Sequence, residues 1–284
     1  DKLSFTPISV STGLVWDFTT GYNLGLSLTH AQRAPSAAEI YSVGPHLGTS
    51  SYDVGALFTI EEVLGKHTLQ YHGSVKKEAS NNLDISLRKF SGELGYVVNF
   101  FYNQVSNFYY QANTGLHYSD LLTEEAHDED EHQEDLPIFI YQQDDATLYG
   151  IEAEFSWQIT PEIKWTLWGD SMHAKLDNSK HLPRAPASRI GNRFEFDYLG
   201  WQTELSASHY FKQSHVAEHE STTAAYTMID LQTSYVLPLA NTDLTLFAKI
   251  SNLTDEEARV HTSFIKHLAP LPGRGISLGI RSEF

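Results

Sequence analysis

An alternation of apolar and polar residues, repeated along the chain, constrains the fold more than any other feature of this sequence. Ile229, Leu231 and Tyr235, for example, alternate with Asp230 and Gln232. A period of two indicates β-strands with one apolar face and one polar face. About eleven such segments can be placed, near residues 8–18, 22–32, 83–90, 94–109, 146–158, 163–176, 187–198, 201–212, 226–237, 243–253 and 274–284.

The length of these segments favours strands that cross a membrane. Many run for about 10–14 residues, whereas strands of soluble proteins usually have about five or six. About ten residues are enough for a tilted strand to cross a bilayer, and the last segment, 274–284, has this length and ends on Phe284. No apolar run approaches the roughly eighteen residues of a membrane-spanning helix, so any span must be built from strands.

Composition restricts the partners and the chemistry. The chain has no Cys, which excludes disulfides and thiolate metal sites. Its formal net charge of −17 argues against nucleic acid as a partner and favours cations. Aromatic residues make up 12% of the chain, as expected where one strand face meets lipid.

The connections between the segments differ strongly in length. Short links alternate with long ones, and the long ones cover residues 33–82, 110–145, 177–186, 213–225 and 254–273. In an up-and-down meander, alternate connections lie on the same side, which places all the long loops at one end. This arrangement is typical of outer-membrane barrels. We therefore predict an all-β, antiparallel transmembrane β-barrel, with a soluble sandwich or propeller as the alternative.

An odd number of strands indicates that the eleven segments alone do not form a complete barrel. An open sheet of about eleven strands would leave two unpaired edges in lipid, where missing backbone hydrogen bonds are not tolerated. Either a strand has been missed, for which residues 66–78 are the first candidate, or the chain is part of a larger barrel. We favour the second explanation because the sequence starts abruptly at Asp1 without a signal peptide.

Several ordered motifs resemble those of a known family. The segments Arg33–Tyr41, Asn81–Leu87, Thr147–Glu152 and Ser251–Asp255 resemble conserved stretches of TonB-dependent outer-membrane receptors, as does Pro272-Gly273-Arg274 before the last strand. The resemblance implies half of a 22-stranded barrel in the bacterial outer membrane. Residues 1–284 would be its C-terminal portion, with the plug domain absent, outer-membrane lipid and lipopolysaccharide around it, and contact with TonB made through a missing N-terminal part.

A finer resemblance points to the zinc-uptake (ZnuD-like) branch of this family. The stretch Tyr41–Thr49 is similar to that branch, in which a His after the Ala-Pro-Ser segment lies near the metal path. His46 occupies the matching position. Residues His261–Ile265 also look like a stretch of the same branch.

The segment 124–135 carries the clearest chemical signal. It holds eight carboxylates and two imidazoles in twelve positions, without a basic residue. A bound dication would relieve the resulting repulsion, and imidazole with carboxylate oxygen suits Zn²⁺. The predicted ligands here are Glu124, His127, Asp128, Glu131 and His132. The alternative interpretation is a solvated acidic loop that keeps the outer surface hydrophilic.

Other histidines in the predicted outer loops extend the candidate metal site. His117 lies at the entrance of the acidic segment, and His215 and His219 are four residues apart in another loop. We therefore expect a receptor that takes up a metal ion, with Zn²⁺ favoured as the transported ligand. A haem or siderophore receptor and a surface metal-binding protein without a transport role remain open. No catalytic constellation is found, so we expect no enzymatic activity.

Overall fold

Eleven long strands form one continuous antiparallel sheet in a computed structural model of the chain. The structure describes residues 3–63, 65–121, 135–177, 180–239 and 242–283. Each long strand pairs with its neighbours along the sequence, apart from inserted short strands. The strands are β1 (Val10–Thr19), β2 (Tyr22–Arg33), β7 (Glu78–Lys89), β8 (Leu94–His117), β9 (Pro137–Gln158), β10 (Ile163–Leu176), β11 (Arg189–Tyr198), β12 (Trp201–Tyr210), β13 (Tyr226–Leu239), β14 (Thr242–Ser251) and β15 (Gly275–Glu283). The prediction of a long antiparallel meander is confirmed.

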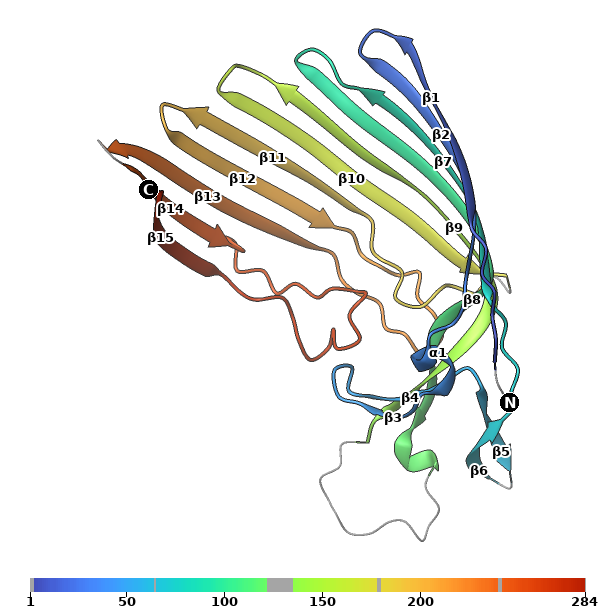
Figure 1. Cartoon of the computed structure of the whole chain (residues 1–284). Helices are drawn as coiled ribbons and strands as arrows, with labels where there is room; N and C mark the ends of the chain where they lie inside the picture. Colours follow the sequence, from blue (N-terminus) through green and yellow to red (C-terminus); the bar gives the residue numbers. More distant parts are fainter. Residues whose placement is uncertain (1–2, 64, 122–134, 178–179, 240–241, 284) are drawn as a thin grey trace.

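The sheet is arched, and its connections differ at the two ends (Figure 1). Tight turns lie together at one end, and those after β1, β7 and β11 contain Gly21, Gly92 and Gly200, with φ of 79°, 84° and 84°. These left-handed values favour glycine at each turn. All the long connections lie at the opposite end (Figure 1), as the loop lengths predicted.

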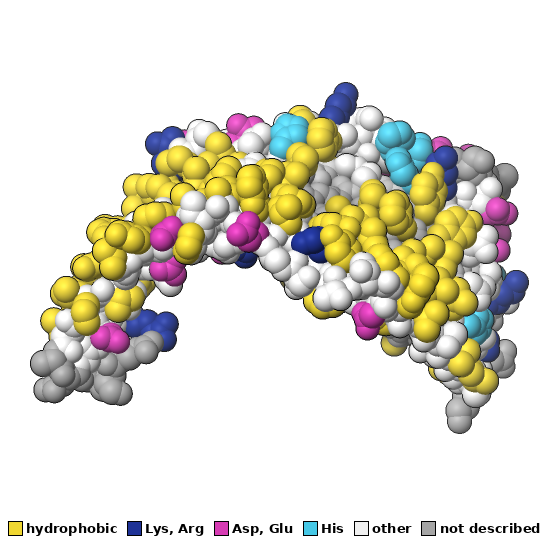
Figure 2. All heavy atoms as spheres, turned by 90° about the horizontal axis from the view of Figure 1, so that it is seen from above, with side chains coloured by type: hydrophobic (Ala, Val, Ile, Leu, Met, Phe, Trp, Pro, Cys, Tyr) yellow, Lys and Arg dark blue, Asp and Glu magenta, His cyan; other side chains and the backbone are white. Residues whose placement is uncertain are grey.

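Cross-strand register separates an apolar face from a polar one. Leu14, Leu26, Ile85, Phe100 and Ile151 stand opposite one another in a row across β1, β2, β7, β8 and β9. All five side chains are more than a third exposed. Figure 2 shows hydrophobic side chains spread over the arched sheet. An exposed apolar surface of this extent is what a lipid-facing barrel wall requires.

The other face carries polar rows. Lys164, Glu195, Glu204, Gln232 and Lys249 are aligned across β10 to β14. They line a hollow of about 780 Å³, so this face is the concave one. It corresponds to the wet interior that the alternation predicted.

The long segment between β2 and β7 folds into small elements of its own. These are α1 (Ala37–Tyr41), β3 (Val43–His46), β4 (Ser51–Val54), β5 (Phe58–Val63) and β6 (Lys66–Tyr71), and a short 3₁₀ helix, η1 (Tyr118–Leu121), follows β8. Residues 66–78, the candidate for a missed strand, therefore add no strand to the barrel sheet, in line with the favoured explanation of a larger barrel. Residues 66–71 pair only with β5, because Gly65 closes a local hairpin and β2 already pairs with β7.

The buried residues gather at the loop end rather than in the middle of the sheet. Leu57, Ile138 and Val54 are fully buried where the segment between β2 and β7 packs on β8 and β9. This packing closes the concave side at that end and fixes the loops that carry the candidate site. Among the described residues, no helix is long and apolar enough to span a membrane.

Both edges of the sheet are open in the described chain. β1 pairs only with β2, and β15 pairs only with β14. The arch in Figure 1 therefore does not close on itself. In lipid, the backbone groups of such edges need further strands as partners.

Candidate functional site

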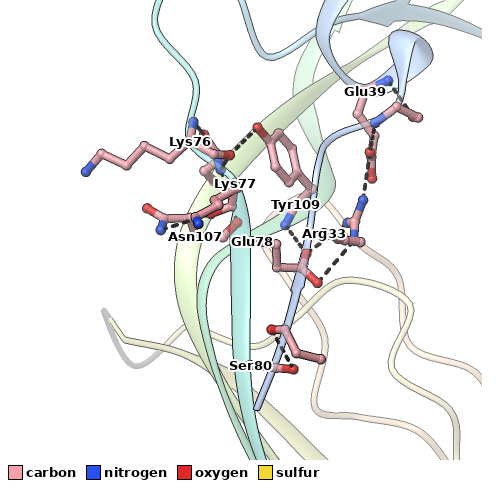
Figure 3. Close-up of polar contacts among 11 residues, drawn as sticks. Arg33, Glu39, Lys76, Lys77, Glu78, Ser80, Asn107 and Tyr109 are labelled. Carbon is pink, nitrogen blue, oxygen red and sulfur yellow. Dashed lines mark hydrogen bonds and ion pairs between the residues drawn. The ribbon is translucent and has the colours of Figure 1, made fainter. Parts of the chain in front are cut away.

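An ion-pair network fixes the start of the segment between β2 and β7 (Figure 3). The Arg33 guanidinium donates to Glu39 Oε2 at 2.9 Å and, through its Nη2 and Nε atoms, to the Glu78 carboxylate at 2.8 and 3.1 Å. Ser36 and Glu39 form a capping box at the N-terminus of α1. Together these contacts tie α1 to β2 and β7 and set the direction in which the chain enters β3.

Glu39 is held in its charged form at this network. Burial raises the pKa of Glu39, but hydrogen bonds from Arg33 and Ser36 outweigh it and leave the pKa below its ordinary value. The Arg33 guanidinium also lies over the Tyr109 ring, 5.5 Å from its centroid. The Tyr109 hydroxyl donates to the Lys76 carbonyl oxygen at 2.7 Å. The motif that resembled the receptor family is thus a structural anchor.

His46 lies at the end of β3, in a hairpin that packs inside the loop end. Its exposed ring places Nδ1 2.8 Å from Thr49 Oγ1. β4 pairs in parallel with the start of β9, with Tyr52 opposite Ile138. Tyr52 also stacks on Tyr118 of η1, with ring centroids 4.7 Å apart and ring planes 22° apart. The hairpin that carries His46 therefore lies against the residues that lead into the acidic segment.

The described ends of the acidic segment are held together by polar contacts. Asp135 accepts hydrogen bonds from the Ser119 backbone N–H at 3.0 Å and from its hydroxyl at 2.7 Å. Slight burial raises the pKa of Asp135, but these two bonds outweigh it and leave the pKa below its usual value. The His117 backbone N–H donates to Asp120 Oδ2 at 2.8 Å. Glu124, His127, Asp128, Glu131 and His132 lie outside the described residues.

A second group of charged residues surrounds a pocket of about 400 Å³ between three loops. Its walls come from the connections β10–β11, β12–β13 and β14–β15, from the tip of the β3–β4 hairpin, and from β8 and the start of β9. Glu220 holds the walls together. It accepts hydrogen bonds from the backbone N–H groups of Arg184 and Ala217, both at 2.9 Å, and its carboxylate lies 3.2 Å from His261 Nε2.

The electrostatics of this pocket depend on buried charges. Burial raises the pKa of Glu220, but the His261 contact and the two backbone hydrogen bonds outweigh it, and the pKa lies below its ordinary value. Burial lowers the pKa of Lys266, against the attraction of Glu220. The Lys266 ammonium donates to the Ser221 carbonyl oxygen at 2.6 Å. Glu220 thus lies opposite the positive charge of Lys266, in a lining that also contains Asp135 and Glu218.

Arg184 adds a second cation beside aromatic rings. Its guanidinium carbon lies 3.9 Å from the ring centroid of Phe264 and 5.8 Å from that of Phe139. Nη2 donates to the Gln111 carbonyl oxygen at 3.0 Å. Burial lowers the pKa of Arg184. A cationic wall with an aromatic lining is suited to an anionic group attached to an apolar body.

Comparison with known proteins gives the family. The profile of the TonB dependent receptor-like β-barrel family matches residues 2–253 of this chain. The chain belongs to this family. It is therefore an outer-membrane β-barrel segment of a bacterial receptor, and its family consists of transport receptors rather than enzymes.

Solved TonB-dependent receptors share the fold at low sequence identity. The copper transporter OprC matches with a TM-score of 0.73 and 17% identity, over 97% of this chain and 39% of that chain. The siderophore receptor PirA from Pseudomonas aeruginosa matches with 0.59 and 12%, over 97% and 42%. The FrpB iron transporter from Neisseria meningitidis matches with 0.63 and 12%, over 96% and 38%. This chain thus spans about two-fifths of the length of these receptors.

The fold places in different pockets two histidines that are close together in the sequence. His219 lines the pocket around Glu220, whereas His215 lies in a different pocket, where its ring centroid is 5.2 Å from His181 and 6.2 Å from His173. His46 and His117 lie at the acidic segment's side of the loop end. Within the described residues, no three His, Asp or Glu side chains are grouped so that they could hold a metal ion. The metal ligands of the sequence analysis stay predictions.

Few features of the sequence pointed to the residues around the 400 Å³ pocket. Arg184, Glu220 and Lys266 belong to none of the motifs described above. His261 was visible only as part of the stretch that resembles the zinc-uptake branch. Arg184 and Glu220 are 36 positions apart in the sequence, and Ser221 and Lys266 are 45 apart, so only the packing of the loops brings these residues together.

Proposed function

We propose that this chain is the C-terminal half of a 22-stranded TonB-dependent receptor barrel that takes up a metal ion, with Zn²⁺ the favoured cargo. The eleven-strand meander with two open edges supports the first part, as does the two-fifths share of the related receptors. Residues 1–284 supply barrel wall and extracellular loops, in contact with outer-membrane lipid and lipopolysaccharide. The plug and the contact with TonB belong to an N-terminal part. No nucleic acid takes part.

The stacking of Tyr52 on Tyr118 carries the metal-uptake proposal. It holds the hairpin of His46 against η1, which precedes the acidic segment in the sequence. Carboxylates and imidazoles at Glu124, His127, Asp128, Glu131 and His132 collect Zn²⁺ from the medium, and His46 receives it next. Imidazole and carboxylate together suit Zn²⁺, whereas an all-oxygen set would suit Ca²⁺ or Mg²⁺.

Weak sites in series favour passage over retention. An ion held too tightly at the first site would not move on, so an exchangeable capture segment followed by one imidazole suits conduction. The remaining predicted ligands, His117, His215 and His219, lie around the same loop end and would add further exchangeable contacts. Partners from the plug would complete the inner coordination.

A specific observation favours a second candidate, the uptake of an anionic metal chelate. The half-buried Arg184 and the buried Lys266 present positive charge to the 400 Å³ pocket, beside Phe139 and Phe264. The acidic groups of a siderophore or haem would be attracted to these two cations, which share the pocket lining with Asp135, Glu218 and Glu220. The related siderophore receptor fits this candidate, and the related copper transporter fits the first one.

Radioactive zinc uptake by whole cells that carry the full-length receptor separates these candidates. Under zinc limitation, His127→Ala/His132→Ala should raise the external zinc needed for half-maximal uptake and leave the maximal rate unchanged, and His46→Ala should abolish uptake. His67→Ala, in the β5–β6 hairpin, is the matched control and should behave like wild type.

The same assay can contradict each part of the proposal. Zinc uptake unaffected by His46→Ala, together with chelate uptake lost in Lys266→Gln, would replace the free ion with a chelate. A surface metal-binding protein would bind zinc equally in cells with and without TonB and would accumulate none in the periplasm. Zinc accumulation that depends on TonB excludes that possibility.

A further inference from the structure

A chain of three hydrogen bonds leads from the exposed ring of His46 to a buried carboxylate. His46 Nδ1 lies 2.8 Å from Thr49 Oγ1, Thr49 Oγ1 lies 2.7 Å from Ser51 Oγ, and Ser51 Oγ donates to Asp53 Oδ1 at 2.8 Å. Ser51 and Asp53 are 0% and 8% exposed, while His46 is exposed. The chain therefore connects the surface of the hairpin with its buried side.

Counting protons fixes the direction of every bond in this chain. An Asp53 carboxylate can only accept, so Ser51 must give it its single hydroxyl proton. The 2.7 Å contact between the two hydroxyls then needs the proton of Thr49. Thr49 also lies 3.2 Å from the His46 carbonyl oxygen, but this longer contact would leave the shorter one without a proton. With its only proton directed to Ser51, Thr49 can accept but not donate toward His46.

It follows that His46 Nδ1 is the donor of the first bond. In a neutral imidazole, one ring nitrogen carries the proton and the other carries a free lone pair. A proton on Nδ1 therefore leaves the lone pair on Nε2. A Cβ built on Gly48 would lie 3.4 Å from His46 Cε1, so the ring lies beside the backbone of the turn.

The hairpin geometry supports the same arrangement. His46 stands opposite Ser51 in the register of β3 and β4, and Gly44 stands opposite Asp53. β4 is in turn paired with β9, one of the two longest strands of the sheet. The acceptor end of the hydrogen-bond chain, Asp53, thus lies on a strand that pairs with β9. Its donor end, His46, lies at the end of β3, next to the tip of the hairpin.

We propose that Thr49, Ser51 and Asp53 are positioning residues that hold His46 as the Nδ1–H tautomer and so present its Nε2 lone pair to a Zn²⁺ ion. This proposal rests on the proposed zinc uptake only in naming Zn²⁺ as the ion that His46 binds. Hydrogen bonds of this kind orient metal-binding histidines and raise their basicity, and their removal typically costs about 10- to 100-fold in metal affinity. The relay would thus orient His46 for metal binding before the ion arrives.

The tautomer can be measured directly on the full-length receptor labelled with ¹⁵N-histidine. The His46 signals are assigned by their loss in His46→Ala. In the wild type and in Thr49→Ser, the proton should reside on Nδ1. In Thr49→Val, which keeps the shape of the side chain and removes the hydroxyl, the Nε2–H form should appear, and the affinity for added ZnSO₄ should fall by about 10-fold or more. Ser51→Ala breaks the relay at a second point and should have the same effect.

A wild-type His46 with its proton on Nε2 would overturn the proposal. So would a Thr49→Val protein whose tautomer and zinc affinity match the wild type, or a Thr49→Ser protein that fails to restore them. The tautomer is measured without zinc, so its outcome does not depend on the cargo. If Thr49→Val changes the tautomer and zinc affinity while His46→Ala leaves cellular zinc uptake intact, the relay stands and the proposed uptake function is wrong.

Discussion

Glu220 provides the sharpest test of how the three extracellular loops are held together. Glu220→Gln keeps the size of the side chain but leaves one acceptor oxygen where the carboxylate has two. At present each carboxylate oxygen accepts one backbone hydrogen bond, from Arg184 and from Ala217, and one of them also faces His261. In the Gln variant, one of these backbone N–H groups must face an NH₂ group instead.

The expected cost is local. Hydrogen bonds to a charged group contribute about 1.5–3 kcal/mol each. The Gln variant loses one of them, and the other becomes a weaker bond to a neutral amide. Together these changes should lower the free energy of loop opening by about 2 kcal/mol. The side chain is only 10% exposed, so solvent screening removes little of this. A change of about 2 kcal/mol corresponds to roughly 30-fold faster opening-limited exchange.

Hydrogen–deuterium exchange of the full-length receptor measures this opening, in peptides that cover the β10–β11 and β12–β13 connections. The control is Glu218→Gln, two residues away, because Glu218 is exposed and pairs with Lys180 on the surface. Only Glu220→Gln should speed exchange at Arg184 and Ala217. Equal exchange in the two variants, or an unchanged rate in Glu220→Gln, would refute the role given to Glu220.

The same carboxylate predicts a dependence on pH. Its pKa is lowered in the folded loops, so its stabilising effect is present above the ordinary carboxyl pKa and is lost as the pH falls through the lowered value. After correction for intrinsic exchange rates, the wild type should therefore approach Glu220→Gln in strongly acidic solution. If the difference between them is constant with pH, the charge of Glu220 is not what holds the loops.

Three further predictions concern the barrel. Asn252 is fully buried, has a φ of 52° and makes three side-chain hydrogen bonds, which Asn252→Ala removes. The variant should destabilise the full-length receptor by about 3 kcal/mol, and on gels the compact form should be lost at a lower temperature. Ile85→Arg on the convex face should cost about 2–4 kcal/mol and reduce membrane insertion, whereas Gln232→Arg on the concave face should insert normally. The 284-residue chain alone, refolded in detergent, should give no single heat-modifiable monomer, because β1 and β15 have open edges.

The sequence was sufficient for the barrel wall because its two environments are so different. Lipid on one side and water on the other impose a period of two over ten or more residues, and this signal defined all eleven long strands. It failed between β2 and β7. There the elements have four to six residues, too few for a period to be recognised, and α1 depends on a capping box and on Arg33.

The candidate site was less predictable because it depends on contacts between distant loops. The importance of His46 came from a resemblance, and its proximity to the acidic segment depends on Tyr52 meeting Tyr118, 66 residues later. His215 and His219 looked like a pair because they are four residues apart. The backbone adopts a left-handed conformation at His219, with φ of 59°, and the two rings line different pockets.

The charges at the loop end bear on the route that an ion could take. A dication about 8 Å from a single positive charge is repelled by about 4 kcal/mol at an effective dielectric constant of 20. Under the proposed uptake, zinc would avoid the side of the pocket that carries Arg184 and Lys266 and would bind on the side of the β3–β4 hairpin, whose tip lines the same pocket and whose His46 would present its Nε2 lone pair. An anionic chelate would experience the opposite forces and settle beside Phe264. A free ion and a chelate would thus contact different sides of this pocket. For this reason, variants of His46 and Lys266 separate the two candidate functions.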